Sequence, residues 1–278
     1  MALYCPDSNV RLAVLGDELR AYREALGLSL AEVTSKVGIS TSKLSRMENG
    51  RKPQRVEDVA VLLSTYGVRG TRYQDLLALT AVAGELTAEA ESAPSALRVL
   101  ESKATMLVDF QSTLVPALLQ TVPYAQAALR EVGMVDEASI EDRTANRIHR
   151  QAVLRRGRLP QFFALMTETA LRTCVGGPEV MRGQMQFLWE AGHKENVRLR
   201  IIPDLQHGHP GLSGPFQRLR FHRGCLVVIE NRVSSVFIEE PAEVRRYDRI
   251  VVELLSVALS ERDSLDLIAK VGTHHSFH

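Results

Sequence analysis

The sequence predicts a mainly α-helical protein with a mixed α/β part, in which an N-terminal five-helix bundle is followed by an α+β domain. Up to about residue 83, apolar residues recur at helical spacing in five short runs. After Leu159, β-like runs such as VRLRIIP, FQRLRF, CLVVIE and SSVFIE appear between helical segments. The length of 278 residues suits two compact domains.

The first part of the chain carries clear signals for where helices begin and end. Ser29 and Glu32 form a capping-box pattern, and Gly38 ends the helix that they begin. Ser40 can cap the next helix, which ends at the Asn49-Gly50 pair. The five predicted helices cover residues 15–26, 29–37, 40–49, 56–66 and 73–80.

The domain boundary is expected in the segment GELTAEAESAPSA, which is rich in small and acidic residues and poor in large apolar ones. This gives an N-terminal domain of residues 1–83, a linker of residues 84–96 and a C-terminal domain of residues 97–278. In the C-terminal domain, helices are expected around Leu97 to Leu107, from Ile140 to Leu159, near Val180 to Ala191 and from Ala242 to Val271. Pro116 and Pro123 punctuate two further short helical segments.

Helices two and three meet the mechanical needs of a helix-turn-helix, because a short turn with Gly38 separates them and the second of the pair is polar. The whole chain has a net charge of only +1, so DNA binding requires a local basic surface. From Ser40 to Arg55 there are five basic residues and one acid. The first turns of the third helix are expected to read base edges, with Arg46 as the best guanine contact. The predicted DNA-binding residues are Ser29, Ser40, Thr41, Ser42, Lys43, Arg46, Asn49, Arg51, Lys52 and Arg55.

The segment SLAEVTSKVGISTSKLSRMENGRKP resembles the phage repressor and Cro type of helix-turn-helix, also described as xenobiotic-response-element-like. In that family an arginine of the first helix pairs with the glutamate of the E-N-G turn. The resemblance therefore implies a structural ion pair between Arg23 and Glu48. The sequence departs from the family at Leu30, where glutamine is usual, and at Thr34, where alanine usually permits close packing of the helices.

From about Leu97 to the end, the chain resembles the C-terminal domain of a large family of actinobacterial, antitoxin-like regulators. The segments that carry this resemblance are LVPALLQTVPYAQAAL, ETALRTCVGGPEVMRGQMQFL, NVRLRIIP and GHPGLSGPFQRLRF. Regulators of this family are often encoded beside a small partner protein, so the resemblance implies such a partner for this domain. Direct gating by a small molecule is the rival hypothesis.

The apolar residues Pro116, Leu118, Leu119 and Tyr124 either line a partner groove or ligand pocket, or pack between domains. Two other clusters also leave two interpretations open. Six arginines between residues 143 and 158 either extend the DNA-binding surface or form a solvated helix face. Asp204, His207, His209 and His222 either bind a metal or belong to turns, and the turn is favoured because HGHPGLSG reads as one.

The sequence contains no G-x-S-x-G, Walker A or H-E-x-x-H motif, so we expect neither an enzyme nor a bound cofactor or metal. The N-terminus lacks the features of a signal peptide, and the three cysteines lack a C-x-x-C pairing, which favours reduced thiols in the cytoplasm. The expected protein is a homodimeric, repressor-like regulator on operator DNA, associated with the nucleoid and not with a membrane.

Overall fold

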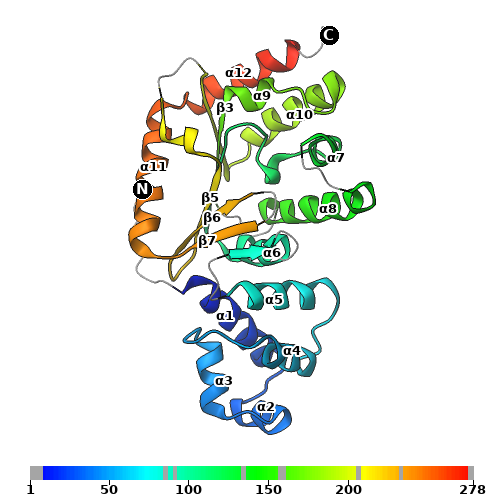
Figure 1. Cartoon of the computed structure of the whole chain (residues 1–278), viewed down its shortest axis with the longest axis vertical. Coiled ribbons are helices and arrows are strands. Elements are labelled where there is room, and N and C mark those ends of the chain that lie inside the picture. The colour runs from blue at the N-terminus through cyan, green and yellow to red at the C-terminus, as the bar shows by residue number, and fades with distance from the viewer. Residues whose placement is uncertain are drawn as a thin grey trace. The chain divides into compact units, whose positions relative to one another are not determined.

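The computed structural model of the chain describes residues 9–83, 87–89, 93–132, 136–155, 161–204, 208–231 and 234–274 (Figure 1). These residues form two compact units. The first comprises described residues of Met1–Ala104 and Arg220–Val244, and the second comprises those of Thr105–Leu219 and Arg245–His278. Residues 84–86 and 90–92 of the predicted linker lie outside the described residues.

The first unit contains the five predicted helices (Figure 1). Each helix buries apolar side chains against the others. The inward side chains are fully buried at Leu15, Leu44 and Leu76. The prediction of an N-terminal five-helix bundle is therefore confirmed. The helices are α1 (Val10–Ala25), α2 (Leu30–Val37), α3 (Thr41–Glu48), α4 (Val56–Thr65) and α5 (Gly70–Val82).

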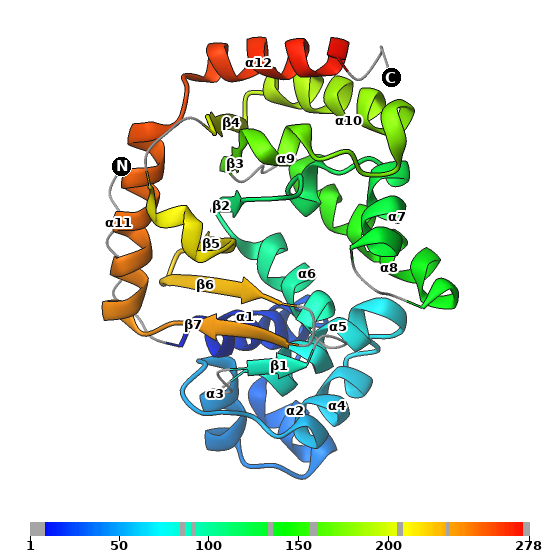
Figure 2. The ribbon, with the colours of Figure 1, turned by 45° about the horizontal axis from the view of Figure 1, so that its top comes forward.

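A further helix and three strands complete the first unit. The helix α6 (Ala93–Lys103) is held to α5 by an ion pair in which Arg98 Nε lies 2.9 Å from Asp75 Oδ2. Strand β7 (Ser234–Ile238) lies between β1 (Thr87–Glu89) and β6 (Cys225–Glu230) and pairs antiparallel with both (Figure 2).

The second unit is built on strands in the order β5-β2-β3-β4. Strands β2 (Met106–Gln111), β3 (Gln161–Thr167) and β4 (Val197–Ile202) are parallel, and β5 (Phe216–Arg220) lies next to β2. Parallel neighbours need crossover connections, and the helices between these strands supply them. Because helices can cover both faces of such a sheet, the four middle residues of β2 are all buried.

Helices α10 and α12 pack against each other and against β4 (Figure 2). On β5, the buried Arg218 pairs with Asp248 of α11, and Phe216 contacts the ring of Tyr247 on the same helix. The helical segments associated with this unit are η1 (Ala117–Leu119), α7 (Val122–Glu131), α8 (Glu137–Arg150), η2 (Gln151–Arg155), α9 (Glu168–Arg172), α10 (Gly177–Gly192), η3 (Pro210–Ser213), α11 (Pro241–Val257) and α12 (Glu261–His274).

The predicted fold class, mainly α with a mixed α/β part, is confirmed. The helix expected around Leu97 to Leu107 is wrong at its end, because α6 stops at Lys103 and Leu107 lies in β2. A strand buried on both faces has a continuous apolar pattern, which resembles that of a buried helix end. The expectation of reduced thiols is also wrong for Cys225, which is disulfide-bonded, whereas Cys174 is free and exposed. Cys5 lies outside the described residues.

Within the described part of the chain, no helix combines the length and the apolar character that crossing a membrane requires.

Candidate nucleic-acid interface

Helix α2 begins with the capping box that the sequence predicts. The Ser29 hydroxyl accepts a hydrogen bond from the Glu32 backbone N–H at 3.2 Å, and the Ser29 backbone N–H donates to Glu32 Oε2 at 2.8 Å. The hydrogen bonds from Ser29 lower the pKa of Glu32. These reciprocal bonds satisfy backbone groups that the first turn of a helix leaves open, so the start of α2 is fixed locally.

Helix α3 has an inward apolar side and an outward polar side. Ser40 caps it by accepting a hydrogen bond from the Lys43 backbone N–H at 3.2 Å. Leu44 and Met47 are buried in the bundle, whereas Thr41, Ser42 and Arg46 are exposed. Since α2 ends at Gly38 and α3 begins at Thr41, the two helices and their short turn have the dimensions of a helix-turn-helix.

The end of α3 packs directly against the backbone of α1. A Cβ atom added to Gly50 would lie 2.7 Å from the Ala13 backbone, and one added to Gly16 would lie 2.7 Å from the backbone oxygens of Met47 and Glu48. Gly50 also has a φ of +64°, a conformation that other residues rarely adopt. This backbone contact positions α3 in the bundle, and no residue with a side chain can replace either glycine without moving it.

At the end of α3, the carboxylate of Glu48 is buried and forms an ion pair with Arg23. Arg23 Nε lies 2.7 Å from Glu48 Oε1, and Arg23 Nη2 lies 2.8 Å from Oε2, so the pair implied by the resemblance is in bidentate contact. The hydrogen bond with Glu48 raises the pKa of Arg23. Burial, together with the negative charge of Glu48, raises the pKa of the neighbouring Tyr66 to about 12. Glu48 therefore stabilises the helix bundle, and its negative charge does not lie on the exposed polar side of α3.

Three predicted DNA-binding residues are exposed but form hydrogen bonds within the protein. The hydroxyls of Ser29 and Ser40 cap helices, as described above. Asn49 accepts a hydrogen bond from Arg20 Nη2 at 2.9 Å and donates from Nδ2 to the Ser45 carbonyl at 2.6 Å. Arg20 also donates to the Glu48 carbonyl at 3.2 Å. The sequence did not point to Arg20, because its role depends on how α1 packs against the end of α3.

Lys43 differs from the other cations of this surface because it has an ion-pair partner. Its Nζ lies 2.8 Å from Oδ1 and 2.8 Å from Oδ2 of Asp58, on the first turn of α4. Sequence reasoning missed Asp58, since no local pattern links residues on two different helices. The contact depends on the angle at which α3 and α4 pack.

Four exposed cations make up the free basic surface. Arg46, Arg51, Lys52 and Arg55 are exposed, and among the described residues no carboxylate lies within ion-pair distance of any of them. Arg46 Nε donates to the Ser42 carbonyl at 3.2 Å, which leaves both of its terminal nitrogens for a ligand. We define the reading surface as Thr41, Ser42, Lys43 and Arg46, bordered by Arg51, Lys52 and Arg55.

The departure at Thr34 is accommodated within α2. Thr34 is buried, and its hydroxyl donates to the Ala31 carbonyl at 3.1 Å, so the polar atom is satisfied inside the helix. Leu30 is half-buried and follows the cap at Ser29. It has no hydrogen-bonding side chain with which to take over the role of the family's usual glutamine.

Comparison with known families agrees with this geometry. A family model described as a helix-turn-helix domain matches residues 14–88, which cover most of α1 and all of α2 to α5. A second, described as a domain of unknown function (DUF5753), matches residues 94–270, more than half of the chain. The chain belongs to the DUF5753 family. No curated protein and no solved structure matches it.

In the DUF5753 domain, Pro116, Leu118, Leu119 and Tyr124 are all buried. They pack in the core of the second unit and do not form an exposed apolar surface. The irregular backbone around them is satisfied by side chains from elsewhere. Gln184 donates to the Leu119 carbonyl at 2.7 Å and accepts from the Thr121 backbone N–H at 2.7 Å. The Gln120 carbonyl accepts from Gln151 at 2.6 Å, and Tyr124 Oη accepts from the Val115 backbone N–H at 3.2 Å.

The arginines of α8 in the DUF5753 domain do not share one environment. Arg143 is exposed, Arg147 donates to Gln120 Oε1 at 2.7 Å, and Arg150 is buried. Residues 156–160, which include Arg156 and Arg158, lie outside the described residues. A single solvated or DNA-facing stripe on α8 is therefore not formed.

The structure does not bring the candidate metal ligands that it describes together into a metal site. Asp204 accepts hydrogen bonds at 3.0 Å from the backbone N–H and the hydroxyl of Thr169. His222 is exposed, and His207 lies outside the described residues. Among the residues that the structure describes, no three His, Cys, Asp or Glu side chains gather as a metal site would require.

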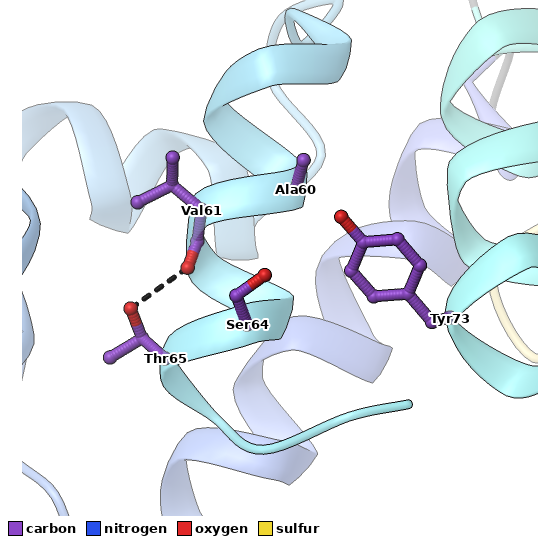
Figure 3. Close-up of a pocket in the computed structure, with 5 residues that line it drawn as sticks. All are labelled: Ala60, Val61, Ser64, Thr65 and Tyr73. Carbon is purple, nitrogen blue, oxygen red and sulfur yellow. Dashed lines mark hydrogen bonds between the residues drawn. The ribbon is translucent and has the colours of Figure 1, made fainter. Parts of the chain in front are cut away.

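A shallow depression lies between α4 and α5 (Figure 3). Its five lining residues are Ala60, Val61, Ser64, Thr65 and Tyr73. The Thr65 hydroxyl donates to the Val61 carbonyl at 2.8 Å within α4. None of the predicted DNA-binding residues lines this depression.

Proposed function

We propose that this protein is a transcriptional regulator that reads operator DNA with α3. The observation that carries the proposal is the reading surface. The exposed polar side of α3 lies opposite an apolar side that packs in the bundle. Arg46 on this side, and Arg51, Lys52 and Arg55 at its border, have no carboxylate partner among the described residues. A helix-turn-helix domain is typical of DNA-binding regulators, and this surface has the charge that phosphate contacts need.

The exposed residues divide into two roles. Arg46 has a planar fork that can grip O6 and N7 of guanine, and Thr41 and Ser42 can contact either bases or backbone. Arg51, Lys52 and Arg55 follow the end of α3, where they can neutralise phosphates and fix the register of the helix in the groove. Ser29, Ser40 and Asn49 support this surface by holding the helix ends.

The proposal includes a homodimer on a palindromic operator. One such helix reads only a few base pairs, and two-fold pairing would place two recognition helices about 34 Å apart, one turn of DNA. The DUF5753 domain would then receive a signal, with a small protein as the partner and a small molecule as the alternative. Because Pro116, Leu118, Leu119 and Tyr124 are themselves buried, a protein partner would bind through other residues of this domain.

The test uses the full chain and a library of random DNA duplexes, from which bound duplexes are selected and sequenced. We expect an enriched sequence, and Arg46→Ala should weaken binding to it by about 1–3 kcal/mol, or roughly 5- to 150-fold at fixed salt. Arg69→Ala is the matched control, because Arg69 is an exposed arginine at the start of α5 and outside the reading surface. Failure to enrich any sequence, or equal binding by the two variants, would contradict the proposal.

A further inference from the structure

Two cations on the reading surface are held in different ways. Arg46 is exposed and makes one hydrogen bond to its own helix. Lys43, one turn earlier, has its ammonium within 2.8 Å of both carboxylate oxygens of Asp58. The side chain of Lys43 is 41% exposed and that of Asp58 is 19% exposed, so the pair lies at the edge of the bundle where DNA can reach Lys43.

Asp58 lies in the first turn of α4. It is the third residue of α4, and the residue before that helix, Arg55, provides no side-chain cap. Negative charge is stabilised at a helix N-terminus, where backbone N–H groups lack intrahelical partners. Asp58 is therefore suited to two tasks, complementing the start of α4 and holding Lys43 of α3.

The ion pair leaves part of Lys43 available. A lysine ammonium has three donors, and two carboxylate oxygens can accept at most two of them in this contact. The remaining donor belongs to a side chain on the first turn of α3, the part of a recognition helix that enters the major groove. Guanine O6 and N7 and thymine O4 are acceptors there.

From this geometry we propose that Asp58 determines sequence specificity, although it is acidic and repels DNA. It cancels the charge of Lys43, which removes an attraction to phosphate that would act on every sequence alike. It also orients Lys43 so that the remaining donor meets a base acceptor only where the operator supplies one. The inference rests on the proposed function, because it assigns the source of discrimination at the same surface.

Asp58→Asn keeps the shape of the side chain and removes its charge. Lys43 then becomes a free cation, so affinity for unrelated duplexes should rise. The slope of log affinity against log salt should become steeper by about one, the contribution of one added phosphate contact. The gain over wild type should accordingly shrink about 3.5-fold between about 50 mM and about 200 mM salt. The ratio of operator to unrelated affinity should fall.

Glu57→Gln provides the matched control. Glu57 is the exposed neighbour of Asp58 on the same turn, and among the described residues it forms no ion pair. Its substitution changes the net charge by the same amount and leaves Lys43 paired. A second control is Asp58→Asn combined with Lys43→Met, in which the freed cation is absent.

The experiment titrates the full chain with the selected duplex and with an unrelated duplex over a range of salt concentrations, and a thermal melt verifies that each variant is folded. We expect Asp58→Asn to lower the ratio of affinities and Glu57→Gln to leave it nearly unchanged. In the Lys43→Met background, Asp58→Asn should have no more effect than Glu57→Gln. Equal effects of the two single variants would overturn the inference alone. A wild-type protein that does not discriminate between duplexes would overturn the proposed function and this inference with it.

Discussion

The reading side of the first unit and the buried segment from Val115 to Thr121 of the second unit use polar side chains in opposite ways. At the start of α3, the Lys43 N–H is capped by Ser40, only three positions away. The outer polar side chains are then free for a ligand. Around η1, the backbone is fixed by side chains from distant helices, and Gln184 is 65 positions from Leu119. Those side chains are buried, and their hydrogen bonds hold the backbone of the core.

This difference distinguishes a region that presents a binding surface from a region that builds a core. A polar residue whose position is set by local caps can be exposed without loss of structure, and such residues form binding surfaces. A buried polar residue must be hydrogen-bonded, and its first role is to prevent an unsatisfied group in the core. The buried Gln184 and Gln151 of the DUF5753 domain therefore hold an irregular stretch of backbone in its core.

The largest expected effect tests the close packing that positions α3. Gly50→Ala should lower the free energy of unfolding by about 3–4 kcal/mol, because the added Cβ meets the α1 backbone and the residue has a positive φ. Gly67→Ala is the control, since Gly67 has a φ of +73° but open space around it, and should cost about 1 kcal/mol. Denaturant unfolding followed by circular dichroism compares them.

Hydrogen exchange of the α3 amides locates the effect of Gly50→Ala. Faster exchange in the 41–50 region of this variant, but not of Gly67→Ala, is expected. Equal losses of stability in both variants would mean that backbone conformation, and not contact with α1, makes Gly50 necessary.

The next largest effect tests the buried segment of the second unit. Gln184→Leu removes the hydrogen-bond partner of the Leu119 carbonyl and that of the Thr121 N–H. The free energy of unfolding should therefore fall by about 2–3 kcal/mol. Gln186→Leu on the same helix removes only an exposed bond to Glu190 and should stay within about 0.5 kcal/mol. Trp189 also lies on α10, so its fluorescence during denaturant unfolding reports on this region. A Gln184→Leu variant as stable as Gln186→Leu would remove the contrast between the two regions.

The sequence predicted the parts of the fold that depend on neighbours in the chain. The capping box at Ser29, the cap at Ser40 and the ends of α2 and α3 all follow from residues within one helical turn. The outward position of Thr41, Ser42 and Arg46 follows from helical periodicity once Leu44 and Met47 are placed inside. These local rules were sufficient for the polar face of the candidate site.

Contacts between helices were beyond the reach of such rules. The Lys43 to Asp58 and Arg20 to Asn49 contacts join residues 15 and 29 positions apart, and they depend on helix packing angles. The helix expected to reach Leu107 overlaps the start of β2, because the buried residues of this strand lack the alternation of a half-exposed strand. The sequence also left the surroundings of Tyr124 open, because apolar spacing alone does not distinguish a core from a groove. In the structure Tyr124 is buried in the core.

The smallest effect at neutral pH tests an inward polar group within the first unit itself. Tyr66 is buried next to Glu48, and its hydroxyl has no hydrogen-bond partner among the described residues. Tyr66→Phe should therefore change the stability at neutral pH by less than about 1 kcal/mol, or raise it slightly.

At high pH the same substitution should protect the protein. The pKa of Tyr66 is about 12 in the folded protein and near its usual value of about 10 when unfolded, so the folded state disfavours the phenolate. The stabilising contribution is complete below about pH 10 and is lost as the pH rises through about 12. Wild type should thus lose about 1–2 kcal/mol relative to Tyr66→Phe across this interval in denaturant titrations at each pH. Tyr73→Phe, which removes a hydroxyl from the open depression, should decline as wild type does. A Tyr66→Phe variant that declines in parallel with wild type would show that the hydroxyl is hydrated in the folded bundle.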